Sequence, residues 1–164
     1  MKISRTIFTG LLLLLFLPIH LAGQQWQDNI EWVSMERALE LASDEEKLIL
    51  IDVFAEWCPY CQRMQSEVYP DQQIEELIDL YFVPVRIDTE SDRSEVYLGR
   101  EFTQAEFARA LRFQSVPTTF FMNSDGEVVG HQPGYLPEDV FAQLLEYVGS
   151  GAYEEISFDE FSNH

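Results

Sequence analysis

The only two cysteines of the chain, Cys58 and Cys61, stand three positions apart in the segment Trp57-Cys58-Pro59-Tyr60-Cys61. Cysteines at this spacing can close a small disulfide ring, or they can hold a soft metal ion such as Cu(I). The preceding residues, 48–54, predict a buried strand, and a helix is predicted to begin at Cys58. Because unpaired N–H groups at a helix N-terminus favour an anion, we expect Cys58 to be the nucleophile. Cys61, one turn later, would resolve a mixed disulfide.

Asp52 is a lone carboxylate within the apolar run Leu48-Ile49-Leu50-Ile51-Asp52-Val53-Phe54. Burying a carboxylate is costly unless it is paired or protonated. Burial would raise the pKa of Asp52, which suits a proton acceptor for the Cys61 thiol. The alternative interpretation is that Asp52 faces a water-filled gap or helps to end the strand.

Pro117 precedes a predicted strand at 118–122 in the segment Val116-Pro117-Thr118. A proline here is compatible with a cis peptide bond. A cis proline beside the thiols would leave the Val116 backbone free to pair with a substrate strand. An ordinary trans proline at the start of a strand is the alternative.

The remaining pattern predicts helices that alternate with strands. Helices are expected at 34–43, 58–69, 74–80, 104–113 and 136–148, and strands at 48–54, 82–88, 118–122 and 127–130. This order predicts an α/β fold with a mixed sheet and helices on both faces. Residues 89–103 are charged and have little apolar pattern, so we expect a surface insertion there.

Both ends of the chain differ from the middle. Residues 1–23 have the basic, apolar, small-residue order of a cleavable secretory signal, with an uncleaved membrane anchor as the alternative. Residues 24–33 are expected to be a polar lead-in, and 149–164 an acidic tail. That tail either packs its aromatic side chains on the domain or docks a partner. Export would place the cysteines in a compartment that permits disulfides, such as the periplasm.

The length and charge exclude several classes of protein. A chain of 164 residues predicts one domain of about 115 residues, at 34–148. Its 29 acidic and 10 basic side chains give a net charge of −19, which excludes nucleic-acid binding. Two cysteines are too few for a disulfide-stapled scaffold or a four-thiolate zinc site. No glycine pattern indicates a nucleotide, haem or flavin site, so no cofactor beyond the cysteine pair is expected.

The segment Phe54-Ala55-Glu56-Trp57-Cys58-Pro59-Tyr60-Cys61 resembles the active-site segment of the thioredoxin superfamily. Asp52 falls at the position of that family's buried aspartate. Val116-Pro117-Thr118 resembles its cis-proline loop, and Gly134 its glycine after the final hairpin. The resemblance implies a thioredoxin-like fold with a central mixed sheet of four to five strands. It also implies a substrate-binding surface formed by Trp57, Pro59, Tyr60, Val116, Pro117 and Gly134.

Two features depart from the family pattern. The dipeptide between the cysteines is Pro59-Tyr60, where thioredoxin has Gly-Pro, which leaves the direction of electron flow open. The lysine that often partners the buried aspartate has no counterpart, since Pro84 falls near its position and Arg86 is the nearest base.

The chain is most similar to exported bacterial thioredoxin-like proteins, which predicts a monomeric, exported reductase of protein disulfides. A membrane electron donor would keep it reduced. A disulfide-forming oxidase, a Cu(I)-handling protein and a non-enzymatic binding module are the alternatives.

Overall fold

A computed structural model describes residues 28–163 of the chain. The predicted signal at 1–23 and the first residues of the lead-in therefore lie outside the described residues. The strands are β1 (Leu48–Phe54), β2 (Phe82–Asp88), β3 (Ser94–Tyr97), β4 (Arg100–Thr103), β5 (Thr118–Met122) and β6 (Val128–Pro133). The helices are α1 (Met35–Glu45), α2 (Pro59–Arg63), the π-helix η1 (Met64–Val68), α3 (Gln72–Tyr81), α4 (Gln104–Ala110), α5 (Glu138–Gly149), the 3₁₀ helix η2 (Ala152–Glu154) and α6 (Phe158–Ser162).

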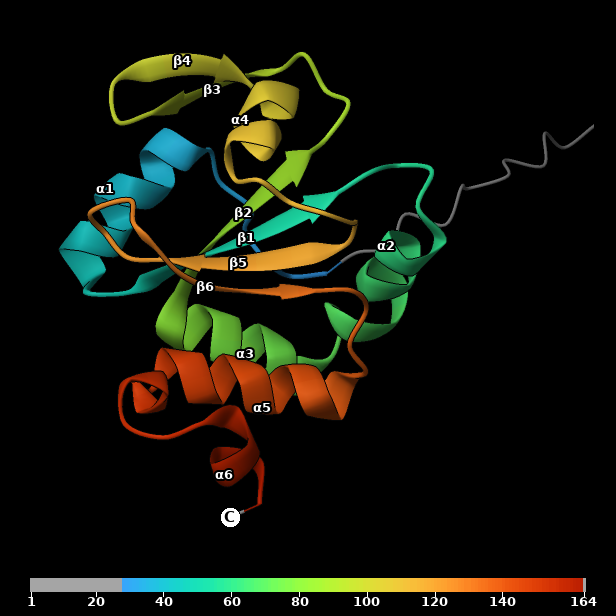
Figure 1. Cartoon of the computed structure of the whole chain (residues 1–164), viewed down its shortest axis with the longest axis vertical. Coiled ribbons are helices and arrows are strands. Elements are labelled where there is room, and N and C mark those ends of the chain that lie inside the picture. The colour runs from blue at the N-terminus through green and yellow to red at the C-terminus, as the bar shows by residue number, and fades with distance from the viewer. Residues whose placement is uncertain (1–27, 164) are drawn as a thin grey trace, which may run out of the picture.

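A four-stranded sheet in the order β2-β1-β5-β6 forms the centre of the molecule (Figure 1). β1 pairs with β2 in parallel and with β5 antiparallel, and β6 pairs antiparallel with β5. The predicted mixed α/β sheet of the thioredoxin-like fold is therefore confirmed. β1 is buried over its five middle residues because it has a neighbour on each edge and helices on each face.

Two apolar layers cover the sheet, and residues alternate between them along each strand. Ile49, Ile51 and Val53 of β1 pack with α1 and α4, whereas Leu50 packs with α3 and α5. Figure 1 shows α1 and α4 on one side of the sheet and α3 and α5 on the other. Asp52 is two residues after Leu50, so its side chain lies on the same face of β1 and points into the layer that contains η1, α3 and α5.

The segment 89–103 contains more structure than its composition indicated. β3 and β4 form an antiparallel hairpin, joined by Leu98 and Gly99, which both have positive φ. Tyr97 and Phe102 pack against the apolar layer of α1 and α4. This insertion is therefore anchored on the domain, because Tyr97 and Phe102 lie on the same face of the hairpin.

Several predicted boundaries also shift. The helix expected from Cys58 to Tyr69 has only five α-helical residues, and a π-helical turn follows them. The last strand extends to Pro133 rather than ending at Gly130. In the tail, Phe158 and Phe161 of α6 pack on Tyr147 of α5, at 5.4 and 5.3 Å between ring centroids. Within residues 28–163, no helix has the length and apolar character needed to cross a bilayer.

Candidate active site

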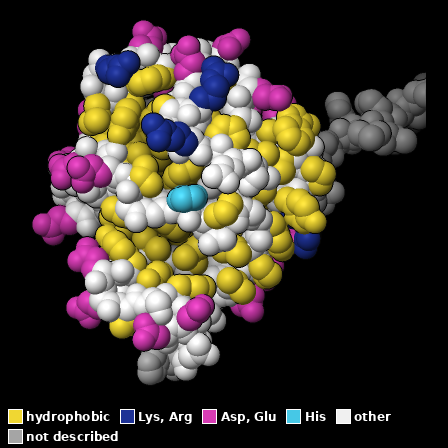
Figure 2. Space-filling view, viewed as in Figure 1, with side chains coloured by type: hydrophobic (Ala, Val, Ile, Leu, Met, Phe, Trp, Pro, Cys, Tyr) yellow, Lys and Arg dark blue, Asp and Glu magenta, His cyan; other side chains and the backbone are white. Residues whose placement is uncertain are grey.

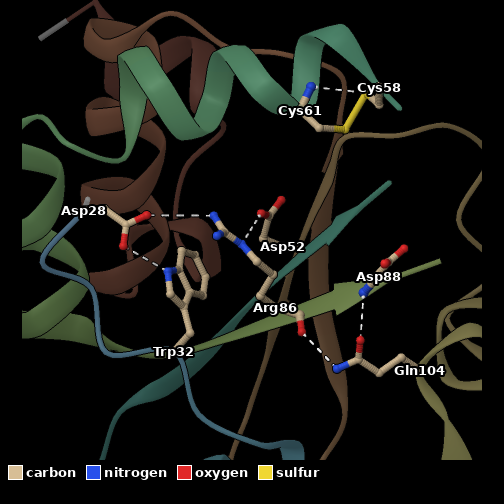
Figure 3. A network of polar contacts seen from close by, with 8 residues as sticks. All are labelled: Asp28, Trp32, Asp52, Cys58, Cys61, Arg86, Asp88 and Gln104. Atoms are coloured by element: carbon tan, nitrogen blue, oxygen red, sulfur yellow. Dashed lines mark hydrogen bonds and ion pairs between the residues drawn. A yellow bond between two sulfur atoms is a disulfide. The ribbon is translucent and has the colours of Figure 1, made fainter. Parts of the chain in front are cut away.

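Cys58 and Cys61 form a disulfide at the start of α2, at one end of the sheet (Figures 1 and 3). β1 delivers the chain to this point, and a tight turn follows in which the Cys58 N–H donates to the Ala55 carbonyl at 3.1 Å. Cys58 is the N-cap of α2, and Pro59 takes the first helical position, where no N–H is needed. The two Cα atoms lie 5.2 Å apart, as one helical turn requires.

The sulfur of Cys58 is held by backbone groups from two parts of the chain. It accepts a hydrogen bond from the Cys61 N–H at 3.1 Å, and it lies 3.6 Å from the Val116 carbonyl oxygen. Both cysteines are buried, at 3% and 2% exposure. An N–H donor aimed at Cys58 Sγ favours the thiolate once the disulfide is reduced. The geometry therefore gives the Cys58 sulfur a backbone N–H donor.

Val116 and Pro117 lie beside the disulfide, at the entrance to β5. The Val116–Pro117 peptide bond is cis. The Gly134 N–H donates to the Pro117 carbonyl at 2.8 Å, and Gly134 has a φ of 90°, which favours glycine. Val116 precedes the paired residues of β5, so its backbone is not part of the sheet.

Exposed aromatic side chains surround the disulfide. Trp57 and Tyr60 are 63% and 57% exposed, which is unusual for side chains of this size. The Trp57 indole N–H donates to Glu90 at 2.9 Å, and the Tyr60 ring lies 6.1 Å from that of Tyr135. Figure 2 shows hydrophobic side chains gathered at the end of the molecule that carries α2. Tyr135 was not identified from the sequence, although its position one residue after Gly134 was an available signal.

Asp52 lies on the sheet face beneath the α2–η1 helix and is 2% exposed. Burial raises its pKa, while the charge of Arg86 and the neighbouring Tyr69 hydroxyl oppose that rise. The Arg86 Nε donates to the Asp52 carboxylate at 3.2 Å, and the two residues face each other across β1 and β2. No hydrogen bond joins Asp52 to either cysteine in the part of the chain described. The predicted carboxylate therefore lies close below the site but is paired with Arg86.

Among residues 28–163, no group of three or more His, Cys, Asp or Glu side chains is arranged to hold a metal ion. His131, on β6, stacks on Phe120 at 5.4 Å between ring centroids.

A scan of protein families matches residues 35–149 to the family described as a thioredoxin-like domain, which covers most of the chain. The chain belongs to this thioredoxin-like family. Thioredoxin H3 of Arabidopsis thaliana is 30% identical over 109 residues, which cover 66% of this chain and 78% of that protein. The solved structure of a thioredoxin from Thermus thermophilus is 28% identical, with a TM-score of 0.60, and the match covers 77% of this chain and 93% of that one.

The thiol:disulfide interchange protein DsbD of Vibrio cholerae is 25% identical over 117 residues, which cover 70% of this chain. The match spans only 18% of the length of that DsbD. The family and the Cys58–Cys61 pair make this thioredoxin-like protein a thiol–disulfide oxidoreductase.

Proposed function

We propose that the protein is an exported reductase of protein disulfides, in which Cys58 attacks and Cys61 resolves. The observation that carries this proposal is the Cys58–Cys61 disulfide, with a backbone N–H on Cys58 Sγ and Val116 beside it. The N–H stabilises a thiolate at Cys58, whereas Cys61 has no comparable donor in the described residues.

The reaction begins with both cysteines reduced. The Cys58 thiolate attacks one sulfur of a substrate disulfide, the substrate S–S bond breaks, and the other substrate sulfur leaves as a thiolate. Cys61 then loses its proton and attacks Cys58 Sγ, which releases the second substrate thiolate. Two electrons pass to the substrate, and the product is the Cys58–Cys61 disulfide seen in the structure.

Asp52 is proposed to accept the proton from Cys61. Burial raises the pKa of its carboxyl, which makes it a better proton acceptor. It lies on the sheet face covered by the helix that follows Cys61 (Figure 3).

The surface around the disulfide is proposed to bind an extended segment of the substrate. Val116 offers backbone groups outside the sheet register, which suits strand addition. Trp57, Pro59 and Tyr60 are exposed beside them and offer apolar contact area. Pro117 and Gly134 hold this loop in place through their backbone hydrogen bond.

Export and the source of electrons complete the proposal. The signal-like residues 1–23 support a periplasmic or otherwise exported protein. The similarity to part of a thiol:disulfide interchange protein supports exchange with protein thiols and disulfides. A membrane protein is proposed as the electron donor. We propose a monomer that needs no cofactor beyond its cysteine pair and, at a net charge of −19, binds no nucleic acid.

Insulin-disulfide reduction tests the activity directly. Signal-free protein, with dithiothreitol as the reductant, is expected to accelerate insulin precipitation, and Cys58→Ser is expected to abolish that acceleration. Full activity in Cys58→Ser would overturn the assignment of the nucleophile.

A further inference from the structure

The guanidinium of Arg86 lies between two carboxylates that come from different parts of the chain (Figure 3). Its Nε donates to Asp52 at 3.2 Å, and its Nη2 lies 3.9 Å from the Asp28 carboxylate. Asp52 belongs to β1, whereas Asp28 belongs to the lead-in before α1. The side chain of Arg86 is 22% exposed, so this cluster lies at the margin of the core.

Two residues of the lead-in, Asp28 and Trp32, contact that guanidinium. The indole of Trp32 lies under it, with 4.2 Å from the Arg86 Cζ to the ring centroid, and the Trp32 Nε1 donates to Asp28 at 3.1 Å. The Arg86 Nη2 is buried and makes no hydrogen bond, so the Asp28 contact is an ion pair rather than a hydrogen bond. A planar guanidinium that is stacked on an aromatic ring and hydrogen-bonded through Nε is restricted in its orientation. Asp28 and Trp32 therefore form a clamp around Arg86.

The clamp is fixed to the domain at two points. The Asn29 backbone N–H donates to Glu75 of α3 at 2.8 Å, and the Val33 N–H donates to the Pro84 carbonyl of β2 at 3.0 Å. The lead-in from Asp28 onward is thus an ordered part of the site's surroundings.

We propose that Asp28 and Trp32 are positioning residues, which hold Arg86 against Asp52 and so set the readiness of Asp52 to take a proton from Cys61. This proposal rests on the proposed function of Asp52. Arg86 lowers the pKa of Asp52 against the larger effect of burial, because an adjacent cation favours the charged form. Asp28 offsets part of that charge, and Trp32 keeps both partners in place.

The cluster also has access to solvent. A cavity of about 300 Å³ beside it is lined by Trp32, Phe54 and Arg86, among others. Asp52 is buried, so a proton that it accepts needs such a route to reach water. The groups that face Asp52 and carry or take charge are Arg86 on β2, Asp28 on the lead-in and Tyr69 after η1, while β5 contributes the uncharged Thr119.

The test is the titration of the Asp52 carboxyl carbon by NMR in the reduced, signal-free protein. Asp28→Asn removes a like charge and is expected to lower the midpoint by about half a pH unit or more. Arg86→Gln removes the cation and is expected to raise it, with Arg86→Lys restoring part of the shift. Trp32→Phe changes no charge but removes the donor to Asp28, so a smaller shift in the direction of Asp28→Asn is expected.

Glu31→Gln is the matched control, because Glu31 is an exposed carboxylate of the same segment, outside the clamp. The proposed role of the clamp would be refuted if the Asp52 midpoint moved equally in Glu31→Gln and Asp28→Asn. It would also be refuted if that midpoint stayed unchanged in Trp32→Phe.

The second measurement is the pH profile of iodoacetamide alkylation of Cys58 and Cys61 in the same variants. We expect the profile of Asp28→Asn to shift along with the Asp52 midpoint. If the Asp52 midpoint moves and the alkylation profile does not, the link from the clamp to the thiols is refuted. Both readouts need no substrate, so they remain decisive even if the protein fails to reduce insulin, which would refute only the proposed function.

Discussion

Replacing Asp52 with asparagine is predicted to stabilise the oxidised protein at neutral pH and to slow its reductive cycle. Asp52 is 2% exposed, and burial raises its pKa even with the Arg86 Nε at 3.2 Å. Asparagine has nearly the same shape and no charge, so it removes the cost of burying a carboxylate. Arg86 keeps the Asp28 carboxylate 3.9 Å from its Nη2, and its side chain is 22% exposed, so its charge retains a counterion.

The expected gain in the free energy of unfolding is about 1–3 kcal/mol, the range for removing a buried charge without stranding its partner. For a domain of this size, the melting temperature would then rise by about 3–9 °C. If the substitution instead left the Arg86 charge buried without a counterion, the free energy of unfolding would be expected to fall by a similar or larger amount.

The gain depends on pH in a direction fixed by the pKa of Asp52. In the unfolded chain that pKa is about 3.8, and in the folded protein it is higher, so the folded state holds the proton more tightly. The stability that this group contributes is therefore full below the unfolded pKa and is lost as the pH rises through the folded pKa. The advantage of Asp52→Asn should be absent at low pH and grow across that window.

Urea unfolding of the oxidised proteins, followed by tryptophan fluorescence from about pH 4 to about pH 9, measures this difference. Asp92→Asn is the control, because it removes one charge from an exposed position in the insertion. Wild-type stability at neutral pH in Asp52→Asn, or a lower one, would refute the account of Asp52 as a desolvated carboxylate.

Three further predictions concern the site and the insertion. Cys61→Ser should trap a mixed disulfide between Cys58 and the substrate, visible by mass spectrometry, and failure to accumulate it would contradict the resolving role of Cys61. Trp57→Ala should raise the KM for a protein disulfide several-fold and leave the unfolding free energy within about 0.5 kcal/mol, because the side chain is 63% exposed; an unchanged KM would exclude Trp57 from binding. Glu95→Ala should destabilise the protein by about 2–4 kcal/mol in urea unfolding, since buried Glu95 accepts from the Met35 N–H at 2.9 Å and from Gln104 at 2.8 Å. A loss below about 0.5 kcal/mol would show that these bonds do not anchor the hairpin.

The sheet and its redox pair could be predicted from the sequence because their signals are local. The run 48–54 is apolar enough to specify a buried strand, and the cysteine spacing specifies one helical turn. Asp52 stood out because a carboxylate is rare in such a run. These features need no knowledge of distant parts of the chain.

The hairpin at 94–103 was missed because its buried polar residue, Glu95, breaks the apolar pattern that marks a strand. Its burial depends on Met35 and Gln104, which come from two helices. The π-helical turn after Arg63 has no sequence signal of its own in this chain.

The sequence identifies only one member of the cluster around Asp52, because the cluster depends on tertiary contacts. Arg86 was identified as the nearest base, but its pairing depends on the register of β1 against β2, which the sequence does not specify. Asp28 and Trp32 lie in a segment that was expected to be a polar lead-in. Their role depends on tertiary contacts with Arg86.

The reduction potential of the Cys58–Cys61 couple in signal-free protein, equilibrated against dithiothreitol or glutathione, tests the central claim most directly. A reductase is predicted to have a value near that of thioredoxin, about −270 mV. A value near about −120 mV would mean that the reduced form is strongly stabilised and that the protein forms disulfides, which would contradict the proposed direction of electron flow.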